Sequence, residues 1–276
     1  MIALIITVVC LAAIAFFWNI AYSSTRAQFQ KLTLGLMTGE PAIDTVFTAE
    51  DWTALPPPVR RYFETSGFTG YPKMSAMKAK FRNVKFSLGP GKPAITIGYT
   101  QCNSALQTSR IAFIDTKMYG IPFQGLDTYV NGAGGMKGVL GKAFTLFDQR
   151  GAEMDQACMV TFLSEVMLLP SAAIQNCITW KPIDDLHAEA VISRYGSTAS
   201  GVFSFHENGE CQSFTTNDRT AVGMDGSRQK VRWSAYMDDY SVMDGIRLPT
   251  RLRAVWHYDE GDLVYFDSNN FRLEYR

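Results

Sequence analysis

The chain has 276 residues, and its 26 lysines and arginines balance its 26 aspartates and glutamates. Apolar residues make up 47% and charged residues 19% of the chain, which excludes a disordered protein and leaves enough apolar side chains for a sizeable core. Nucleic-acid-binding domains carry a basic excess, so the zero net charge argues against a nucleic-acid partner.

The first predicted element is a transmembrane anchor at residues 1–22. This segment has no charged side chain, and at about 1.5 Å per helical residue it can cross a bilayer core of about 30 Å. Trp18 and Tyr22 lie at its end, where amphipathic rings favour the membrane interface. A cleaved signal peptide is the alternative. It would need a basic start, a shorter apolar core and small residues before the cleavage site, whereas Phe16 and Phe17 stand here.

The side of the membrane is indicated only by a few charges. Arg26 and Lys31 follow the span and no basic residue precedes it. By the positive-inside rule this pattern favours a cytoplasmic location for the main domain.

Residues 23–70 are predicted to form a helical stalk and a proline-rich lead-in to the main domain. Thr48 and Asp51 have the spacing of a capping box, with aspartate as the acidic partner. Pro58 suits the first position of a short helix over 59–66, and Gly67 suits its C-terminal stop.

Residues 71–276 are predicted to form one β-rich domain. Apolar and basic residues alternate from Met77, and beyond Asn83 the phase of the alternation flips, which indicates a β-bulge or bend near Arg82. Regularly spaced strands with tight turns indicate consecutive antiparallel hairpins. At about 153–175 the apolar spacing becomes helical, so a buried helical insertion interrupts the strands.

Motifs that would identify a catalytic, metal or cofactor site are missing from the sequence. His187, His206 and His257 make no zinc-binding pattern, and "GVLGKAF" (138–144) lacks the phosphate-loop spacing and its Ser or Thr. We therefore expect no metal, no cofactor and no recognisable catalytic motif. The cysteines after the predicted span lack C-x-x-C spacing, and two disulfides or four free thiols fit equally well; they are Cys102, Cys158, Cys177 and Cys211.

Glu165 is the one carboxylate in the apolar stretch "TFLSEVMLLPS" (161–171). A carboxylate on such a surface loses solvation unless it is paired. It is therefore a structural ion pair, with Arg60 or Arg61 as the partner, or a ligand anchor, or a catalytic acid, and the first reading is favoured. Raised carboxyl pKa values mark general acids, but acid–base catalysis also needs a second group nearby.

Four segments resemble a bacterial domain family of unknown function whose members often carry an N-terminal membrane span. They are "LPPPVRRYF" (55–63), the stretch 165–170, "ITWKPID" (178–184) and "DYSVMDGIRLPTRLRAVW" (239–256). The resemblance covers most of residues 50–276. The chain departs from the pattern at 167–169, where an aromatic residue is expected before the proline.

The order of strand hairpins, buried helix and further hairpins is also similar to the half-barrel lipoprotein carriers of the LolA/LolB type. This resemblance implies an α+β, mostly antiparallel fold, with a curved sheet (half-barrel) packed on one or two helices. It also implies lipid or lipoprotein binding in the bacterial envelope, which favours an extracytoplasmic domain over the charge-based orientation.

These observations lead to three hypotheses. The first is a membrane-anchored envelope protein that binds a lipid or acyl chain between sheet and helix. The second is an envelope enzyme that uses Glu165, and the third is a structural module with a filled core. The candidate ligand-binding residues are Glu165, Arg60, Trp180, Trp233, Trp256, Tyr258 and Phe266. For the tryptophans, simple core filling is the alternative. The oligomeric state is left open.

Overall fold

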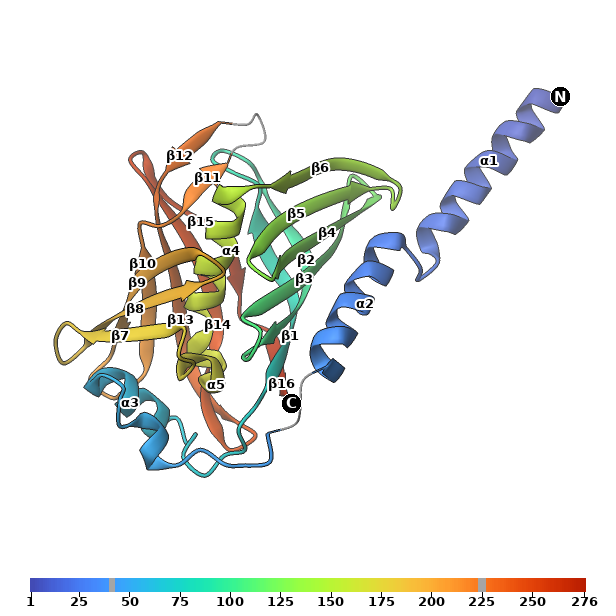
Figure 1. Cartoon of the computed structure of the whole chain (residues 1–276). Coiled ribbons are helices and arrows are strands. Elements are labelled where there is room, and N and C mark those ends of the chain that lie inside the picture. Colours follow the sequence, from blue (N-terminus) through green and yellow to red (C-terminus); the bar gives the residue numbers. More distant parts are fainter. Residues whose placement is uncertain (40–42, 223–226) are drawn as a thin grey trace.

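Two helices begin the chain in the computed structural model, which describes residues 1–39, 43–222 and 227–276. α1 (Ile2–Asn19) is exposed and projects away from the molecule, whereas α2 (Ser24–Gly39) lies beside the sheet (Figure 1). Among the described residues, this N-terminal segment contains the one apolar helical stretch that is long enough to cross a membrane. It is compatible with a membrane span or with a signal sequence.

α2 packs on the outer face of the sheet. Phe29 stacks on Phe113 with the ring centroids 5.4 Å apart, and Arg26 forms an ion pair with Asp115. Because Arg26 has this structural role, it is a weaker indicator of membrane orientation than the sequence alone implied. Residues 40–42 of the predicted stalk lie outside the described residues.

The later helical segments are short. They are η1 (Ala49–Trp52), α3 (Pro57–Thr65), α4 (Ala152–Ser164), η2 (Val166–Leu168) and α5 (Pro170–Ala173). Thr48 and Asp51 form both hydrogen bonds of the predicted capping box at η1. Prolines fill the first turn of α3, and Gly67 follows the helix with φ +85°, a conformation that favours glycine.

One curved, open antiparallel sheet forms the body of the domain, with fourteen strands among the described residues. The first half consists of β1 (Ala76–Ser87), β2 (Ala94–Ser104), β3 (Ser109–Met118), β4 (Ile121–Val130), β5 (Ala133–Leu140) and β6 (Phe144–Arg150). The second half consists of β7 (Ile178–Pro182), β8 (His187–Arg194), β9 (Ser197–Phe205), β10 (Cys211–Thr216), β13 (Arg232–Met243), β14 (Ile246–Tyr258), β15 (Gly261–Ser268) and β16 (Phe271–Tyr275). A separate hairpin is formed by β11 (Thr220–Val222) and β12 (Arg228–Lys230).

The strand order explains how the two halves make one sheet. The chain runs outward from β1 to β6 at one edge, and it returns from β7 at the opposite edge to β15 and β16, which pair with β1. α4 connects the two edges and lies within the hollow of the curved sheet (Figure 1). The predicted antiparallel half-barrel around a buried helix is therefore confirmed.

The predicted bulge lies at the junction of the two halves. The register of β1 against β2 shifts between Phe81 and Val84, and Asn83 has φ +55°. β1 pairs with β16 up to Phe81 and with β15 from Lys85, so the bulge marks the change of partner. It also re-aims the side chains so that the apolar set faces the hollow on both sides of the bend.

The helical insertion has three pieces instead of one helix. α4 ends at Ser164, η2 follows Glu165, and Pro170 starts α5. The predicted range of about 153–175 is therefore helical over most of its length, with the break at the carboxylate. Most of α4 and the following turns are buried in one core cluster with residues from both halves of the sheet.

Candidate functional site

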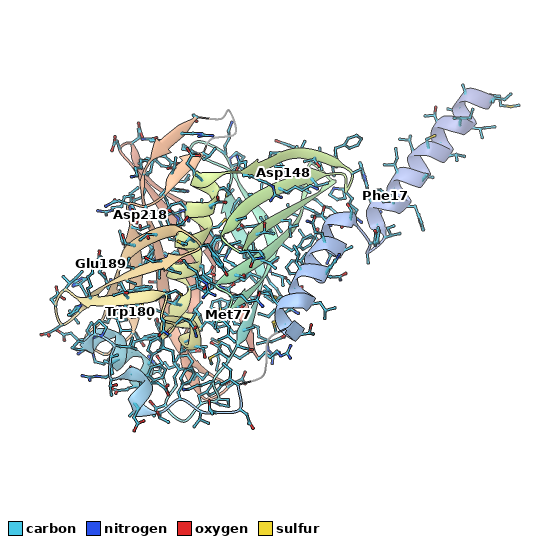
Figure 2. The ribbon with its side chains drawn as sticks, viewed as in Figure 1. Phe17, Met77, Asp148, Trp180, Glu189 and Asp218 are labelled. Carbon is cyan, nitrogen blue, oxygen red and sulfur yellow. The ribbon has the colours of Figure 1, made fainter. Side chains whose placement is uncertain are left out.

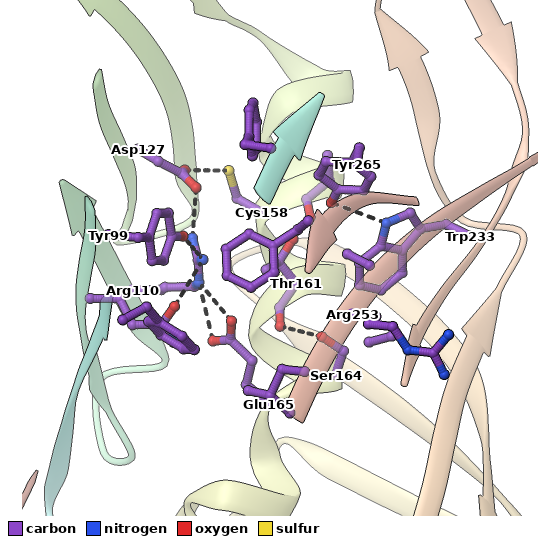
Figure 3. A pocket seen from close by; sticks show the side chains of 18 of the residues that line it. Tyr99, Arg110, Asp127, Cys158, Thr161, Ser164, Glu165, Trp233, Arg253 and Tyr265 are labelled. Atoms are coloured by element: carbon purple, nitrogen blue, oxygen red, sulfur yellow. Dashed lines mark hydrogen bonds and ion pairs between the residues drawn. The ribbon is translucent and has the colours of Figure 1, made fainter. Parts of the chain in front are cut away.

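A cavity of about 240 Å³ lies between the inner face of the sheet and α4. Figure 3 shows its two walls, with strands of the first half on one side of α4 and strands of the second half on the other. Most of the lining is apolar or aromatic, including Phe81, Phe86, Ile114, Met136, Met237 and Leu252. An engineered apolar cavity of roughly 150 Å³ holds benzene, so this volume suits a small apolar group or part of an alkyl chain.

Arg110 on β3 is the centre of the polar wall. Its Nη1 donates to Oδ2 of Asp127 at 2.7 Å, and its Nε donates to both carboxylate oxygens of Glu165 at 3.1 and 3.2 Å (Figure 3). Nη2 donates to the hydroxyl of Tyr99 and to Oε1 of Gln101. One guanidinium therefore joins β2, β3, β4 and the end of α4.

Because the network is buried, the charge of Arg110 depends strongly on its two carboxylate partners. The Arg110 side chain is only 5% exposed, and burial acts to lower its pKa. The charges of Glu165 and Asp127 outweigh burial, so the pKa of Arg110 lies well above its usual value and the guanidinium stays charged. Removal of Arg110 would leave two partly buried carboxylates without their shared counter-ion.

Glu165 is fully engaged within this network. Besides its contacts with Arg110, its Oε2 accepts a hydrogen bond from Nδ2 of Asn103 at 2.6 Å. Both carboxylate oxygens therefore already act as acceptors. This arrangement suits an ion pair that positions α4 against the first half of the sheet.

The other wall is aromatic and carries a second arginine. The guanidinium carbon of Arg219 lies 4.4 Å from the ring centroid of Trp233 and 5.0 Å from that of Trp256. Trp233 donates its Nε1 to the hydroxyl of Tyr265 at 3.1 Å (Figure 3). Trp233 and Trp256 are cross-strand partners on β13 and β14, which explains why both rings reach the same cation.

Three of the candidate residues from the sequence line the cavity: Glu165, Trp233 and Phe266. Trp256 contacts the cavity residue Arg219, and the ring of Tyr258 lies 6.5 Å from that of Trp256. These two residues continue the aromatic wall beside Trp233. Their role in ligand binding stays a prediction.

The other two candidates lie away from the cavity. Arg60 is exposed on α3. Trp180, labelled in Figure 2, lies on the edge strand β7, where it packs on Phe203 and donates Nε1 to the carbonyl of Ala173 at 2.9 Å. Trp180 therefore fills the core, which is the alternative that the sequence left open for the tryptophans.

The predicted ion-pair partner of Glu165 was wrong. Glu165 pairs with Arg110, while Arg61 donates to the carbonyl of Asp185. The reason is the placement of α3, which buries Val59, Tyr62 and Phe63 and directs its arginines away from α4.

Sequence reasoning missed four charged or polar residues of the two walls: Tyr99, Arg110 and Asp127 on the polar wall and Arg219 on the aromatic wall. A signal was present for Arg110, because it shares its strand face with the buried residues Ala112 and Ile114. A charged residue at an inward-facing position of an alternating strand indicates a buried, partnered charge. Arg219 lies between β10 and β11, outside any strand with alternating apolar residues, so the sequence carried no comparable indication of its role.

The cysteines form no disulfide, and burial keeps the thiol at the cavity neutral. All five cysteines are free, which selects the thiol alternative over disulfides. Cys158 lies at the cavity beside Asp127, and burial and the aspartate charge raise its pKa well above the usual value, so it remains a neutral thiol. Within the described ranges, no cluster of three or more His, Cys, Asp and Glu side chains is placed to hold a metal ion.

Residues 45–268 match the profile of a family described as "Family of unknown function (DUF6544)". The chain belongs to this family. The match spans the strands from β1 to β15, the helical insertion and every cavity residue, while α1, α2 and β16 lie outside it. Membership in DUF6544 confirms the resemblance to a family of unknown function.

Two solved structures are similar to this DUF6544 protein. One is a LolA superfamily protein from Nitrosomonas europaea, with 10% identity and a TM-score of 0.38. The other is a DUF1329 family protein from Desulfovibrio piger, with 11% identity and a TM-score of 0.42. Each comparison covers 84% of this chain and 94% of the other chain. No curated protein matches the chain.

Proposed function

We propose that the protein binds an apolar ligand, such as an alkyl or acyl chain, in the cavity between sheet and α4, while α1 holds the domain at a membrane. The observation that carries this proposal is the cavity itself, about 240 Å³ of space with a mainly apolar and aromatic lining. A structural module has no need for such a space, since voids in a core reduce stability.

Burial of alkyl surface would supply the binding energy. Each buried methylene contributes about 0.8 kcal/mol, and few directional contacts are needed. Because the cavity lies below the roughly 300–1,000 Å³ typical of drug-sized ligands, one chain fits better than a pair. The enzyme alternative is less favoured, because Arg110 and Asn103 already occupy both carboxylate oxygens of Glu165.

Calorimetric titration of 1-decanol into the full chain in lipid nanodiscs tests the proposal, with empty nanodiscs as the reference for partitioning. Ala235→Phe places a ring in the cavity, and Ala133→Phe, at the exposed start of β5, is the matched control. Displacement of two or three ligand methylenes should cost roughly 2 kcal/mol, or about thirtyfold in affinity, in the cavity variant alone. Absence of saturable binding, or equal binding by both variants, would refute the proposal.

A further inference from the structure

Arg219 differs from the other cations of the cavity. Arg110 is held by Glu165 and Asp127, and Arg253 is held by a carboxylate of β13 at 2.8 Å. No carboxylate of the described residues lies within ion-pair distance of Arg219. Its Nε and Nη1 are buried and have no hydrogen-bond partner among the residues that the structure describes.

The aromatic rings explain the position of Arg219 but leave its hydrogen-bonding capacity unused. Cation–π contact with Trp233 and Trp256 attracts the positive charge to the wall. Indole rings offer no hydrogen-bond acceptor to the N–H groups. A guanidinium presents several donors in one plane, an arrangement that matches the oxygens of a carboxylate or a phosphate.

The charges divide the cavity into two ends. On the first-half side, Glu165 and Asp127 surround the single cation Arg110, so that group carries one net negative charge. On the Trp233 side, Arg219 supplies a positive charge that has no directly bound counter-ion among the described residues. An anionic group inside the cavity is therefore attracted to the Arg219 end and repelled from the Arg110 end.

We propose that the ligand is a single-chain amphiphile with an anionic carboxylate or phosphate head group, bound by Arg219, with its alkyl chain in the apolar remainder of the cavity. This inference rests on the proposed function, because it requires the cavity to take up an alkyl chain. It adds the class of head group and the orientation of the ligand.

The test compares four probes of equal chain length on the full chain in nanodiscs: decanoate, decyl phosphate, 1-decanol and decylammonium. Decanoate or decyl phosphate should bind roughly tenfold to a hundredfold more tightly than 1-decanol, the range expected for a hydrogen bond to a charged group. The two anions distinguish a fatty-acid-like ligand from a phosphate-bearing one. Decylammonium should bind most weakly.

Arg219→Gln should remove the preference for the anion, measured as the ratio of the affinities for decanoate and 1-decanol in the same variant. Arg219→Lys should retain part of the preference, because the charge remains without the planar fork. The matched control is Arg251→Gln, which removes an arginine of β14 that is paired with Asp267 outside the cavity. The control should retain the full preference.

The outcomes separate the two proposals. Equal affinity for decanoate, decyl phosphate and 1-decanol, or tightest binding of decylammonium, would overturn the assignment of Arg219 while the apolar cavity stands. A preference that survives in Arg219→Gln would overturn it as well. If none of the four probes binds, the proposed function itself fails. The comparison of probes on the unmodified chain remains decisive even if an Arg219 variant does not fold.

Discussion

At the residue scale, the ion pair between Arg110 and Glu165 joins strand β3 to the end of α4. Arg110→Met would leave Asp127 and Glu165 without their shared partner, and we expect a loss of roughly 3–5 kcal/mol in the free energy of unfolding. Glu165→Gln should cost less, roughly 1–3 kcal/mol, because Asp127 still compensates Arg110.

Chemical denaturation of both variants measures these losses. Arg251→Met, at an ion pair in which the arginine side chain is 39% exposed, is the control and should cost at most about 1 kcal/mol. A larger loss for Glu165→Gln than for Arg110→Met would contradict the central role of Arg110.

Asp51 gives a second prediction at this scale, on the dependence of stability on pH. Burial acts to raise the pKa of Asp51, but hydrogen bonds from Lys73 and Thr48 outweigh it and hold the pKa below its ordinary value of 3.8. Asp51→Asn should cost roughly 1 kcal/mol at pH 7. A depressed carboxyl pKa stabilises the fold above the unfolded value, so this difference should shrink as the pH falls below about 3.8.

Denaturant midpoints at pH 7 and pH 3 check this trend. Glu50→Gln, an exposed neighbour on the same turn, serves as the control and should change stability by no more than about 0.5 kcal/mol at either pH. A difference between Asp51→Asn and the unmodified chain that is independent of pH would show that the charge of Asp51 is not the cause.

At the scale of elements, the position of α4 depends on a glycine of β5. A Cβ at Gly134 would lie 2.5 Å from the carbonyl oxygen of Met154, and the Gly134 amide donates to Oδ1 of Asp155 at 2.6 Å. The backbone of β5 at Gly134 therefore packs directly against the backbone of the first turn of α4. Gly134→Ala should cost roughly 1–3 kcal/mol by forcing the helix away from the sheet.

The same substitution at Gly98 of β2, where a Cβ would meet only the Asp115 carbonyl at 3.4 Å, is the matched control. We expect its effect to stay within about 0.5 kcal/mol. Because Gly134 sets the spacing of α4 from the sheet, Gly134→Ala should also alter 1-decanol affinity, whereas Gly98→Ala should not. Equal stability of the two variants would mean that α4 tolerates displacement.

At the scale of the whole molecule, α1 joins the domain through few contacts. The Lys142 ammonium, in the turn after β5, donates to the carbonyl of Ile20 just beyond α1 at 2.5 Å. The apolar side chains of α1 are exposed, and no other part of the described chain buries them. We expect a bilayer to cover it, so the full chain should stay in the membrane fraction after an alkaline carbonate wash.

Intact-mass measurement of the same fraction distinguishes an anchor from a signal sequence. An anchor leaves residues 1–22 on the chain, whereas cleavage would remove them and release the domain. Protease added to cells without an outer membrane should digest the domain if it lies outside the cytoplasm. Complete protection from the protease would instead agree with the orientation predicted from Arg26 and Lys31.

Much of the fold could be predicted because it depends on local patterns. The alternation of apolar residues, its phase flip at Asn83, the capping box at Thr48 and the helical spacing after residue 152 depend on neighbouring residues alone. These patterns identified the strands, the bulge, the short proline-led helix and the buried insertion. The curved antiparallel sheet around a helix was implied by the resemblance of this hairpin order to half-barrel carriers.

The site could be predicted only in part, because its contacts join residues that are far apart in the chain. Sequence identified Glu165 as a charge that needs a partner, but strand pairing and the path of α4 decided that the partner is Arg110 and not Arg60. Likewise, only the pairing of β13 with β14 brings Trp233 and Trp256 together over Arg219. Local periodicity determines which elements form, whereas the enclosure of space and the pairing of charges follow from how the elements pack.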